Sequence, residues 1–485
     1  MHNMPSYFSD IFNIDEKILE DHGAFNVSLI VDLPLFVDPF LVFKKYPALH
    51  DDIIKYLRFL YSKSISAQSD LGQLEAWYYF REIKQNWFGF CAAGNSGSGL
   101  AHEFAISLNR NLGLLLSDFD RRGITQSVHL EKLCLIKEGV GKDRISDFTT
   151  NLIKKHLAEY TQVFAEKYLK SDQKRKIVVD KVHFNYTTER WEPDAFILPY
   201  FNKDYVLLTP KDMLTKDDSW INKTEFHDKF LDIPNSIPDG QLRAEINNYL
   251  ASVIPNKPQQ KDYAKAINLA SERYPILIDY YIKSKEDTSE EALKRSIDKV
   301  FVSQQVYVEQ FGQFVLFLST NSLFYSIKGD TADEALERIH FLKDIVENKG
   351  GWKWFWYKGI PIRREEDIHI LYRLTWRNSP SDVSREVNDG RGPADFKISR
   401  GSQDKAIVEF KLASNPQIKR NLEHQTEIYK KASDAKTGYK VIFYFSYEEY
   451  VKITGILDEL NLRNDATVVL VDARADNKPS ASKVG

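Results

Sequence analysis

Two charged residues near the C-terminus have types and a spacing that suit phosphate chemistry. Glu409 and Lys411 lie two residues apart in an otherwise apolar segment, residues 406–413. In a β-strand, residues two apart point to the same face, so both charges share one face and Val408 and Phe410 take the other. Burying either charge without a partner costs several kcal/mol, so the pattern indicates either a cross-strand ion pair or a metal site.

Asp395 lies upstream of this segment, after a glycine-rich turn, and begins a strand that can pair with the Glu409 strand through the loop Ser399–Asp404. Because neighbouring strands lie about 4.8 Å apart, the two carboxylates can converge on one divalent cation. Glu366, from the preceding helix, could supply a third oxygen. Such a hard, oxygen-only ligand set beside a lysine suits Mg²⁺ or Mn²⁺ and phosphate chemistry.

The elements that must position these residues can be read from periodicity and turn signals. In chain order we expect a helix at 363–376, a strand at 383–387, a strand starting at Asp395, a strand at 406–413, a helix at 421–433, a strand at 439–445, a helix at 447–460 and a strand at 467–472. This order predicts an α/β sandwich with a central mixed sheet.

The residues and this order of elements resemble the PD-(D/E)XK nuclease superfamily, which has a restriction-endonuclease-like αβββαβ core. Gln425 and Tyr429 on the following helix also match the Q-x-x-x-Y pattern of its RecB-like and lambda-exonuclease-like members. The likeness covers about a quarter of the chain. One departure is Ala394, which stands where the family has proline, while Pro393 comes one place earlier.

The resemblance implies a role for each matching residue. Asp395 and Glu409 would bind metal, and Lys411 would orient or activate the attacking water and stabilise developing charge. Gln425 and Tyr429 would orient the metal or contact a phosphate. The helix acid that some members use matches Glu366, although Glu365 and Glu386 compete for that role. Basic residues nearby that could hold the nucleic-acid backbone, or form a solvated basic face, are Arg391, Lys419, Arg420, Lys430 and Lys431.

These observations predict a Mg²⁺- or Mn²⁺-dependent nuclease acting on nucleic acid, with DNA favoured over RNA. A large additional region beside a nuclease-like domain is also typical of bacterial antiviral defence effectors. The alternative is a catalytically inactive module that keeps the fold and grips nucleic acid or a protein partner. Metal-dependent phosphodiester cleavage distinguishes the enzyme from the binding module.

Length and composition indicate several folded domains. The chain has 485 residues, of which 43% are hydrophobic and 13% aromatic, and its formal net charge is −3. We expect a mixed α/β domain at residues 1–255, a helical connecting segment at 256–350 and the nuclease-like domain at 351–485. The N-terminal region could sense or position substrate, and it could mediate homo-oligomerisation or bind a partner protein.

The two cysteines, Cys91 and Cys134, have no metal-binding spacing and no disulfide framework. The first residues lack a basic start followed by an apolar run, and no apolar stretch is long enough to span a membrane. We therefore expect a cytoplasmic protein without a membrane partner.

Two further segments border the nuclease-like domain. In the last helix of the connecting segment, Thr331 and Glu334 match a capping box, and Gly350 and Gly351 end the helix. The aromatic run Trp352–Tyr357 could stack on bases, although packing of a strand or an interdomain wedge accounts for it better.

Overall fold

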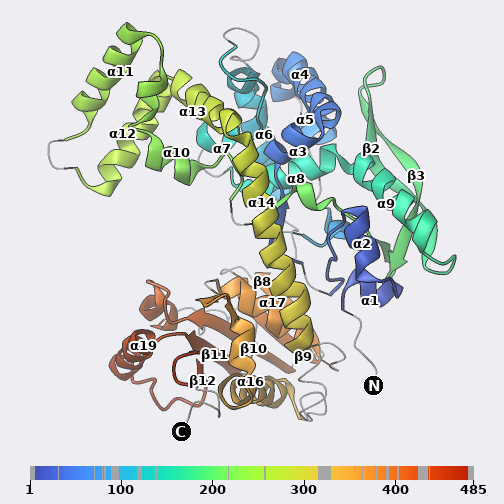
Figure 1. The fold of residues 1–485 in the computed structure, drawn as a ribbon, viewed down its shortest axis with the longest axis vertical. Helices are drawn as coiled ribbons and strands as arrows, with labels where there is room; N and C mark the ends of the chain where they lie inside the picture. Colours follow the sequence, from blue (N-terminus) through green and yellow to red (C-terminus); the bar gives the residue numbers. More distant parts are fainter. Residues whose placement is uncertain are drawn as a thin grey trace.

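The structure is a computed structural model. It describes residues 6–30, 32–69, 71–78, 80, 83–88, 98–116, 123–136, 140–216, 218–255, 258–314, 329–362, 364–376, 379, 381–388, 393–400, 404–423, 435 and 437–478. Within this part of the chain, no helix is long and apolar enough to cross a membrane. The C-terminal sheet and its helices lie at one end of the molecule, and most of the N-terminal region lies at the other (Figure 1).

The N-terminal region contains α-helices, two paired strands of 12 residues each and several shorter strands. Its α-helices are α1 (Phe8–Phe12), α2 (Glu16–His22), α3 (Pro39–Lys45), α4 (Pro47–Ser69), α5 (Leu71–Tyr78), α6 (Ser98–Leu116), α7 (Lys132–Ile136), α8 (Lys142–Leu152), α9 (Lys154–Tyr168), α10 (Lys223–Lys229) and α11 (Gly240–Val253). Its strands are β1 (Leu35–Val37), β2 (Lys174–Asn185), β3 (Arg190–Phe201), β4 (Asp204–Tyr205) and β5 (Leu214–Lys216). Short 3₁₀ turns lie at Lys84–Asn86, Lys211–Met213 and Ile233–Ser236.

Between residues 258 and 350, the residues that the structure describes are mostly helical. It contains α12 (Gln260–Arg273), α13 (Ile276–Asp287), α14 (Ser289–Ser303), a π-helical stretch at Gln304–Gln310 and α16 (Thr331–Asn348). Helix α14 runs from the N-terminal region towards the C-terminal sheet (Figure 1). Helix α16 packs directly on that sheet, since Lys343 donates to the Leu470 carbonyl and Ala332 accepts from the Tyr439 hydroxyl.

The C-terminal region is built on a mixed sheet with strand order β12-β11-β10-β9-β8. Its elements are a 3₁₀ turn (Gly351–Phe355), β6 (Trp356–Tyr357), β7 (Ile360–Pro361), α17 (Glu365–Thr375), β8 (Asp382–Asn388), β9 (Pro393–Arg400), β10 (Asp404–Leu412), β11 (Thr437–Tyr444), α19 (Tyr447–Glu459) and β12 (Val468–Asp472). Strands β8, β9 and β10 pair antiparallel, whereas β10, β11 and β12 pair parallel. The predicted mixed α/β architecture is confirmed.

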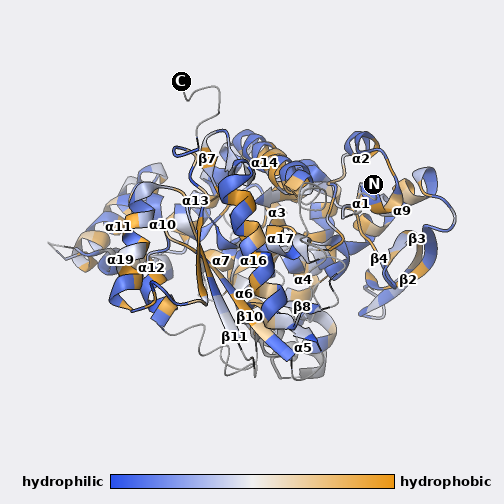
Figure 2. Cartoon of the chain, turned by 90° about the horizontal axis from the view of Figure 1, so that it is seen from below, coloured by the Kyte–Doolittle hydropathy of each residue, from blue (hydrophilic) through white to orange (hydrophobic). Residues whose placement is uncertain are grey.

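Apolar side chains on both faces of the sheet explain why helices cover both. On one face, Val408, Phe410 and Phe443 join the main core that also contains apolar residues of α16 and α17. On the other face, Ile442 packs with Ile453 of α19 in a separate cluster. Hydrophobic colour on the strands and mixed colour along α16 reflect this arrangement (Figure 2). The sheet is therefore the middle layer of a three-layer sandwich.

The aromatic run after α16 is used for packing. Phe355 is fully buried in the main core, and Trp354 packs on Phe314 with ring centroids 4.9 Å apart. The indole nitrogen of Trp356 donates to the Ala473 carbonyl at 2.7 Å. These contacts favour the packing interpretation of the run over base stacking.

The start of α16 differs from the predicted capping box. Asp330 is the N-cap, and its carboxylate accepts from the Asp333 amide. The Thr331 hydroxyl instead donates to Asp404 at 2.7 Å. Glu334 turns inward and is fully buried, so it does not reach back to the helix start. The capping-box prediction was wrong because buried cations compete for the Glu334 carboxylate more strongly than the backbone does.

Glu334 is the acceptor at the centre of a buried ion network. It receives hydrogen bonds from Arg338 at 2.8 Å and 3.1 Å, from the hydroxyls of Ser379 and Ser381, and from Arg400. Arg338 is itself 2% exposed. Removing the carboxylate would leave buried guanidinium donors without their acceptor.

We expect Glu334→Ala to lower the free energy of unfolding by about 3–5 kcal/mol, because it leaves the buried Arg338 charge unpaired. The measurement is chemical denaturation of the full chain. The control is Glu337→Ala on the exposed face of the same helix, with an expected change within about 0.5 kcal/mol. Equal effects of the two substitutions would contradict this account of the network.

Candidate active site

The candidate site forms where β9 and β10 separate. Their antiparallel register runs as far as Val408 opposite Phe396. Beyond this pair, carboxylates take the place of strand carbonyls as acceptors. The Phe410 amide donates to Asp395 Oδ2 at 2.7 Å, and the Asp395 amide donates to Glu409 Oε1 at 3.1 Å. Because backbone donors inside a protein need acceptors, the divergence itself holds both carboxylates in place.

Lys411 lies among the carboxylates. Its Nζ is 3.2 Å from Glu365 Oε2, 3.3 Å from Asp395 Oδ2 and 3.4 Å from Glu409 Oε2. The lysine side chain is 9% exposed and that of Glu409 is 3% exposed. We call Asp395, Glu409, Lys411 and Glu365 the carboxylate–lysine cluster. The structure thus brings together the three residues that the sequence singles out, on two adjacent strands.

Helix α17 supplies the helix acid of the cluster. Glu365 is its first residue, and Glu365 Oε1 accepts from the Leu412 amide at 3.3 Å and from Asn415 Nδ2 at 3.0 Å. Glu365 was an alternative to Glu366 in the sequence analysis. The side chains of Glu366 and Glu386 lie outside the part of the chain that the structure describes. Among the three candidate acids, Glu365 is the one that the described structure places beside Lys411.

His369 is a member of the site that sequence reasoning missed. Its Nε2 lies 3.2 Å from Asp395 Oδ2, and its ring packs edge-on against Phe396 and Phe410. The signal that could have found it is its spacing. Residues four apart on a helix share a face, so a helix that presents Glu365 to the strands also presents His369.

The surroundings shift the pKa values of the two strand carboxylates in opposite directions. Burial acts to raise the pKa of Asp395, but His369 and Lys411 outweigh it and hold this pKa well below its ordinary value. Burial, followed by the charge of Asp395, raises the pKa of Glu409 well above its ordinary value. Burial acts to lower the pKa of Lys411, but the three neighbouring carboxylates raise it overall. Asp395 therefore ionises much more readily than Glu409, and Lys411 holds its proton more tightly than an ordinary lysine.

The cluster contains the type of oxygen ligand that the predicted metal ion prefers. Asp395 and Glu409 offer carboxylate oxygens, which are the ligands that Mg²⁺ and Mn²⁺ prefer. In the described residues, no group of three or more His, Cys, Asp or Glu side chains is arranged to hold a metal ion. The ammonium of Lys411 balances the carboxylates instead. Metal binding would require Glu409 to lose its proton, so it should release a proton and strengthen as the pH rises.

The structure describes some of the predicted substrate-binding residues but not Gln425 and Tyr429 of the predicted helix. Lys419 is exposed and pairs with Glu459 of α19 at 2.5 Å, and Arg420 is also exposed. The remaining predicted residues lie outside the described part of the chain, and these are Arg391, Gln425, Tyr429, Lys430 and Lys431. Their roles stay predictions.

Comparison with known families matches two parts of the chain. A family described as a domain of unknown function (DUF8370) matches residues 13–222, and a second (DUF8371) matches residues 331–447. The second match begins with α16 and contains the whole carboxylate–lysine cluster. No curated protein and no solved structure matches the chain.

The raised pKa of Glu409 predicts a pH-dependent effect of Glu409→Gln. The unfolded chain ionises Glu409 above its ordinary pKa, whereas the folded chain keeps it protonated up to its raised pKa. Glu409 therefore lowers wild-type stability as the pH rises between these values, by at most about 1.4 kcal/mol per pH unit. Glutamine has no such dependence, so the variant should gain stability relative to wild type as the pH rises above the ordinary glutamate pKa, and the comparison is made at about pH 5 and about pH 8.

Denaturation of the full chain at both pH values, with EDTA present, measures this difference. Glu337→Gln, at an exposed position of α16, is the matched control and should follow wild type at both pH values. A stability difference for Glu409→Gln that stays constant with pH would show that Glu409 is ionised in the folded chain.

Proposed function

We propose that the C-terminal region is a divalent-metal-dependent nuclease that hydrolyses phosphodiester bonds, with a restriction-endonuclease-like core. The observation that carries the proposal is the meeting of Asp395, Glu409 and Lys411 at the point where β9 and β10 diverge, with the lysine Nζ within 3.4 Å of both carboxylates. The mixed sheet between α16, α17 and α19 supports it. DNA is the favoured substrate, and antiviral defence is the favoured biological context.

Asp395 and Glu409 would hold the metal, which when bound would neutralise phosphate charge and acidify water. The raised pKa of Lys411 indicates a permanent cation. This favours stabilisation of the negative charge that develops on the phosphate over proton abstraction by the lysine. His369 fixes the orientation of the Asp395 carboxylate, and Glu365 holds the lysine ammonium towards the strands.

The alternative, a non-catalytic binding module, also has an observation in its favour. The cluster balances its charges through Lys411 without a metal, as a structural ion network does. Such networks seldom stabilise a fold more than apolar packing would, so a gain in stability explains this cluster less well than a chemical role does. Metal dependence separates the two functions, because a binding module would hold nucleic acid equally well with Mg²⁺ or EDTA.

We expect Lys411→Ala and Asp395→Asn to reduce metal-dependent cleavage by about 10²- to 10³-fold, because the first removes the cation at the reacting phosphate and the second removes a carboxylate that would hold the metal. Asparagine keeps an acceptor for the Phe410 amide, which limits the effect on folding. The assay follows labelled single-stranded DNA, duplex DNA and RNA with Mg²⁺, Mn²⁺ or EDTA.

The control is Lys405→Ala, on the same strand as Lys411 but half-buried at the far end. It should retain wild-type cleavage. Unchanged cleavage in both cluster variants, or cleavage that persists in EDTA, would rule out the proposed mechanism.

A further inference from the structure

A cleft lies directly beside the carboxylate–lysine cluster, at the C-terminal ends of the parallel strands β10 and β11. Its volume is about 740 Å³, within the range of sites that bind small organic molecules. The lining residues are Pro361, Ile362, Arg364, Glu365, Leu412, Ser414, Asn415, Pro416, Phe445 and Glu449. Of the residues in this lining, the functional predictions from the sequence include Glu365, as a candidate helix acid.

Glu365 forms the wall that the cleft and the cluster share. One of its carboxylate oxygens lies 3.2 Å from Lys411 Nζ, and the other accepts from Asn415 Nδ2 at 3.0 Å. A ligand in the cleft would therefore lie next to a phosphate held at Lys411. The cleft is placed to receive the part of a nucleotide that adjoins the reacting phosphate.

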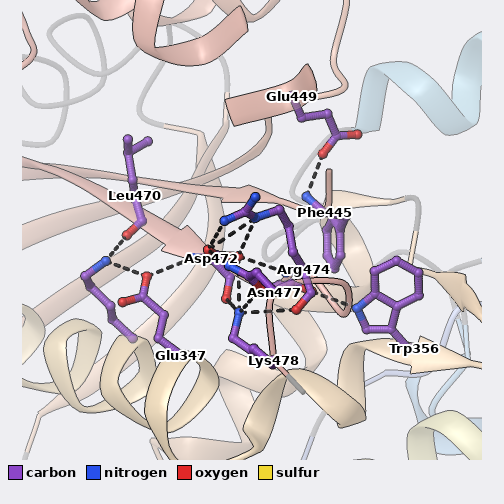
Figure 3. A network of polar contacts seen from close by, with 11 residues as sticks. Glu347, Trp356, Phe445, Glu449, Leu470, Asp472, Arg474, Asn477 and Lys478 are labelled. Carbon is purple, nitrogen blue, oxygen red and sulfur yellow. Dashed lines mark hydrogen bonds and ion pairs between the residues drawn. The ribbon is translucent and has the colours of Figure 1, made fainter. Parts of the chain in front are cut away.

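Hydrogen bonds hold the rim of the cleft rigidly. Lys452 Nζ donates to the carbonyls of Ala413 and Asn415 at 2.9 Å and 3.2 Å, which ties the loop after β10 to α19. The Phe445 amide donates to Glu449 Oε2 at 2.7 Å, and the Phe445 ring lies against Trp356 (Figure 3). A preformed site of this kind loses little conformational entropy when a ligand binds.

The chemistry of the lining selects the kind of ligand. Pro361, Ile362 and Leu412 provide apolar surface for a flat ring, and the acids Glu365 and Glu449 outnumber the one cation of the lining, Arg364. One oxygen of Glu449 accepts from Phe445, while its Oε1 makes no hydrogen bond to a described residue (Figure 3). A ring that carries N–H donors matches both features, because its faces are apolar and its edge can donate to a carboxylate.

We propose that this cleft binds one unpaired nucleobase next to the reacting phosphate, with a base N–H donating to Glu449. The proposal rests on the proposed nuclease function and specifies its substrate. A paired base uses its N–H edge for its partner, and extracting it from a duplex costs a few kcal/mol. The preferred substrate is therefore a single strand, or a duplex with an unpaired segment at the cleavage site.

The test compares binding and cleavage by the full chain. Ile362→Trp fills the cleft, and Glu449→Leu removes the acceptor. Glu448→Leu, at an exposed neighbouring position in the first turn of α19, is the matched control. Binding of a labelled single-stranded oligodeoxynucleotide is measured by fluorescence anisotropy in EDTA, beside a strand of the same length with abasic residues and a fully paired duplex. Cleavage of the same strands is measured with Mg²⁺.

Wild type and Glu448→Leu should bind the normal single strand about tenfold more tightly than the abasic strand, as expected for the contacts of one base. Ile362→Trp and Glu449→Leu should bind both strands equally weakly, and their KM for single-strand cleavage should rise by about the same factor. Equal binding of normal and abasic strands by wild type, or unchanged discrimination in both cleft variants, overturns the base site.

The same experiments distinguish an error in the proposed base site from an error in the proposed nuclease function. If the cleft variants cleave with metal as efficiently as wild type, the base-site proposal is wrong and the nuclease proposal stands. If wild type binds the normal strand more tightly than the abasic strand, the cleft variants lose this preference and wild type cleaves neither strand, the base-site proposal is supported and the nuclease proposal is wrong.

Discussion

The C-terminal site depends on mutual compensation of buried charges around Lys411. A lysine that is 9% exposed and a glutamate that is 3% exposed are each costly to bury alone. Together with Asp395 and Glu365 they form a cluster in which the Lys411 cation offsets the carboxylates around it, while the charge of Asp395 raises the pKa of Glu409. Removing one partner would leave the rest as uncompensated charges, so the strand divergence, the start of α17 and the loop after β10 depend on one another.

This constraint links the N-terminal region to the site through α17. On this helix, Glu365 and His369 face the strands, whereas Asp367 accepts a hydrogen bond from Tyr307 of the π-helical stretch after α14. Lys216 of β5 lies over the Tyr307 ring, with its Nζ 4.8 Å from the ring centroid. The helix that supplies the acid and the histidine is therefore held from both sides. These contacts connect Lys216 of the N-terminal region with the helix that carries Glu365 and His369.

A buried carboxylate also joins the N-terminal region to the connecting segment. The fully buried carboxylate of Glu286 accepts hydrogen bonds from the backbone of Gln126 and Ser127 and lies 2.9 Å from His129 Nε2. These contacts fasten the segment before α7 to α13. Like Asp395 and Glu409 at the divergence of β9 and β10, Glu286 thus accepts from backbone amides that no strand or helix satisfies.

The sequence by itself determined the strands and the face that each charge takes, because a period of two places Glu409 and Lys411 together and leaves Val408 and Phe410 for the core. It also indicated Asp395 as the partner carboxylate. Only the tertiary structure decided that Glu365 lies beside Lys411, that His369 lies beside Asp395 and that Glu334 binds arginines instead of capping α16. Helical spacing places His369 on the same face as Glu365, but the strand residues that this face meets lie far apart from it in the chain, and the partners of Glu334 depend on competition between buried groups. Local periodicity does not determine either.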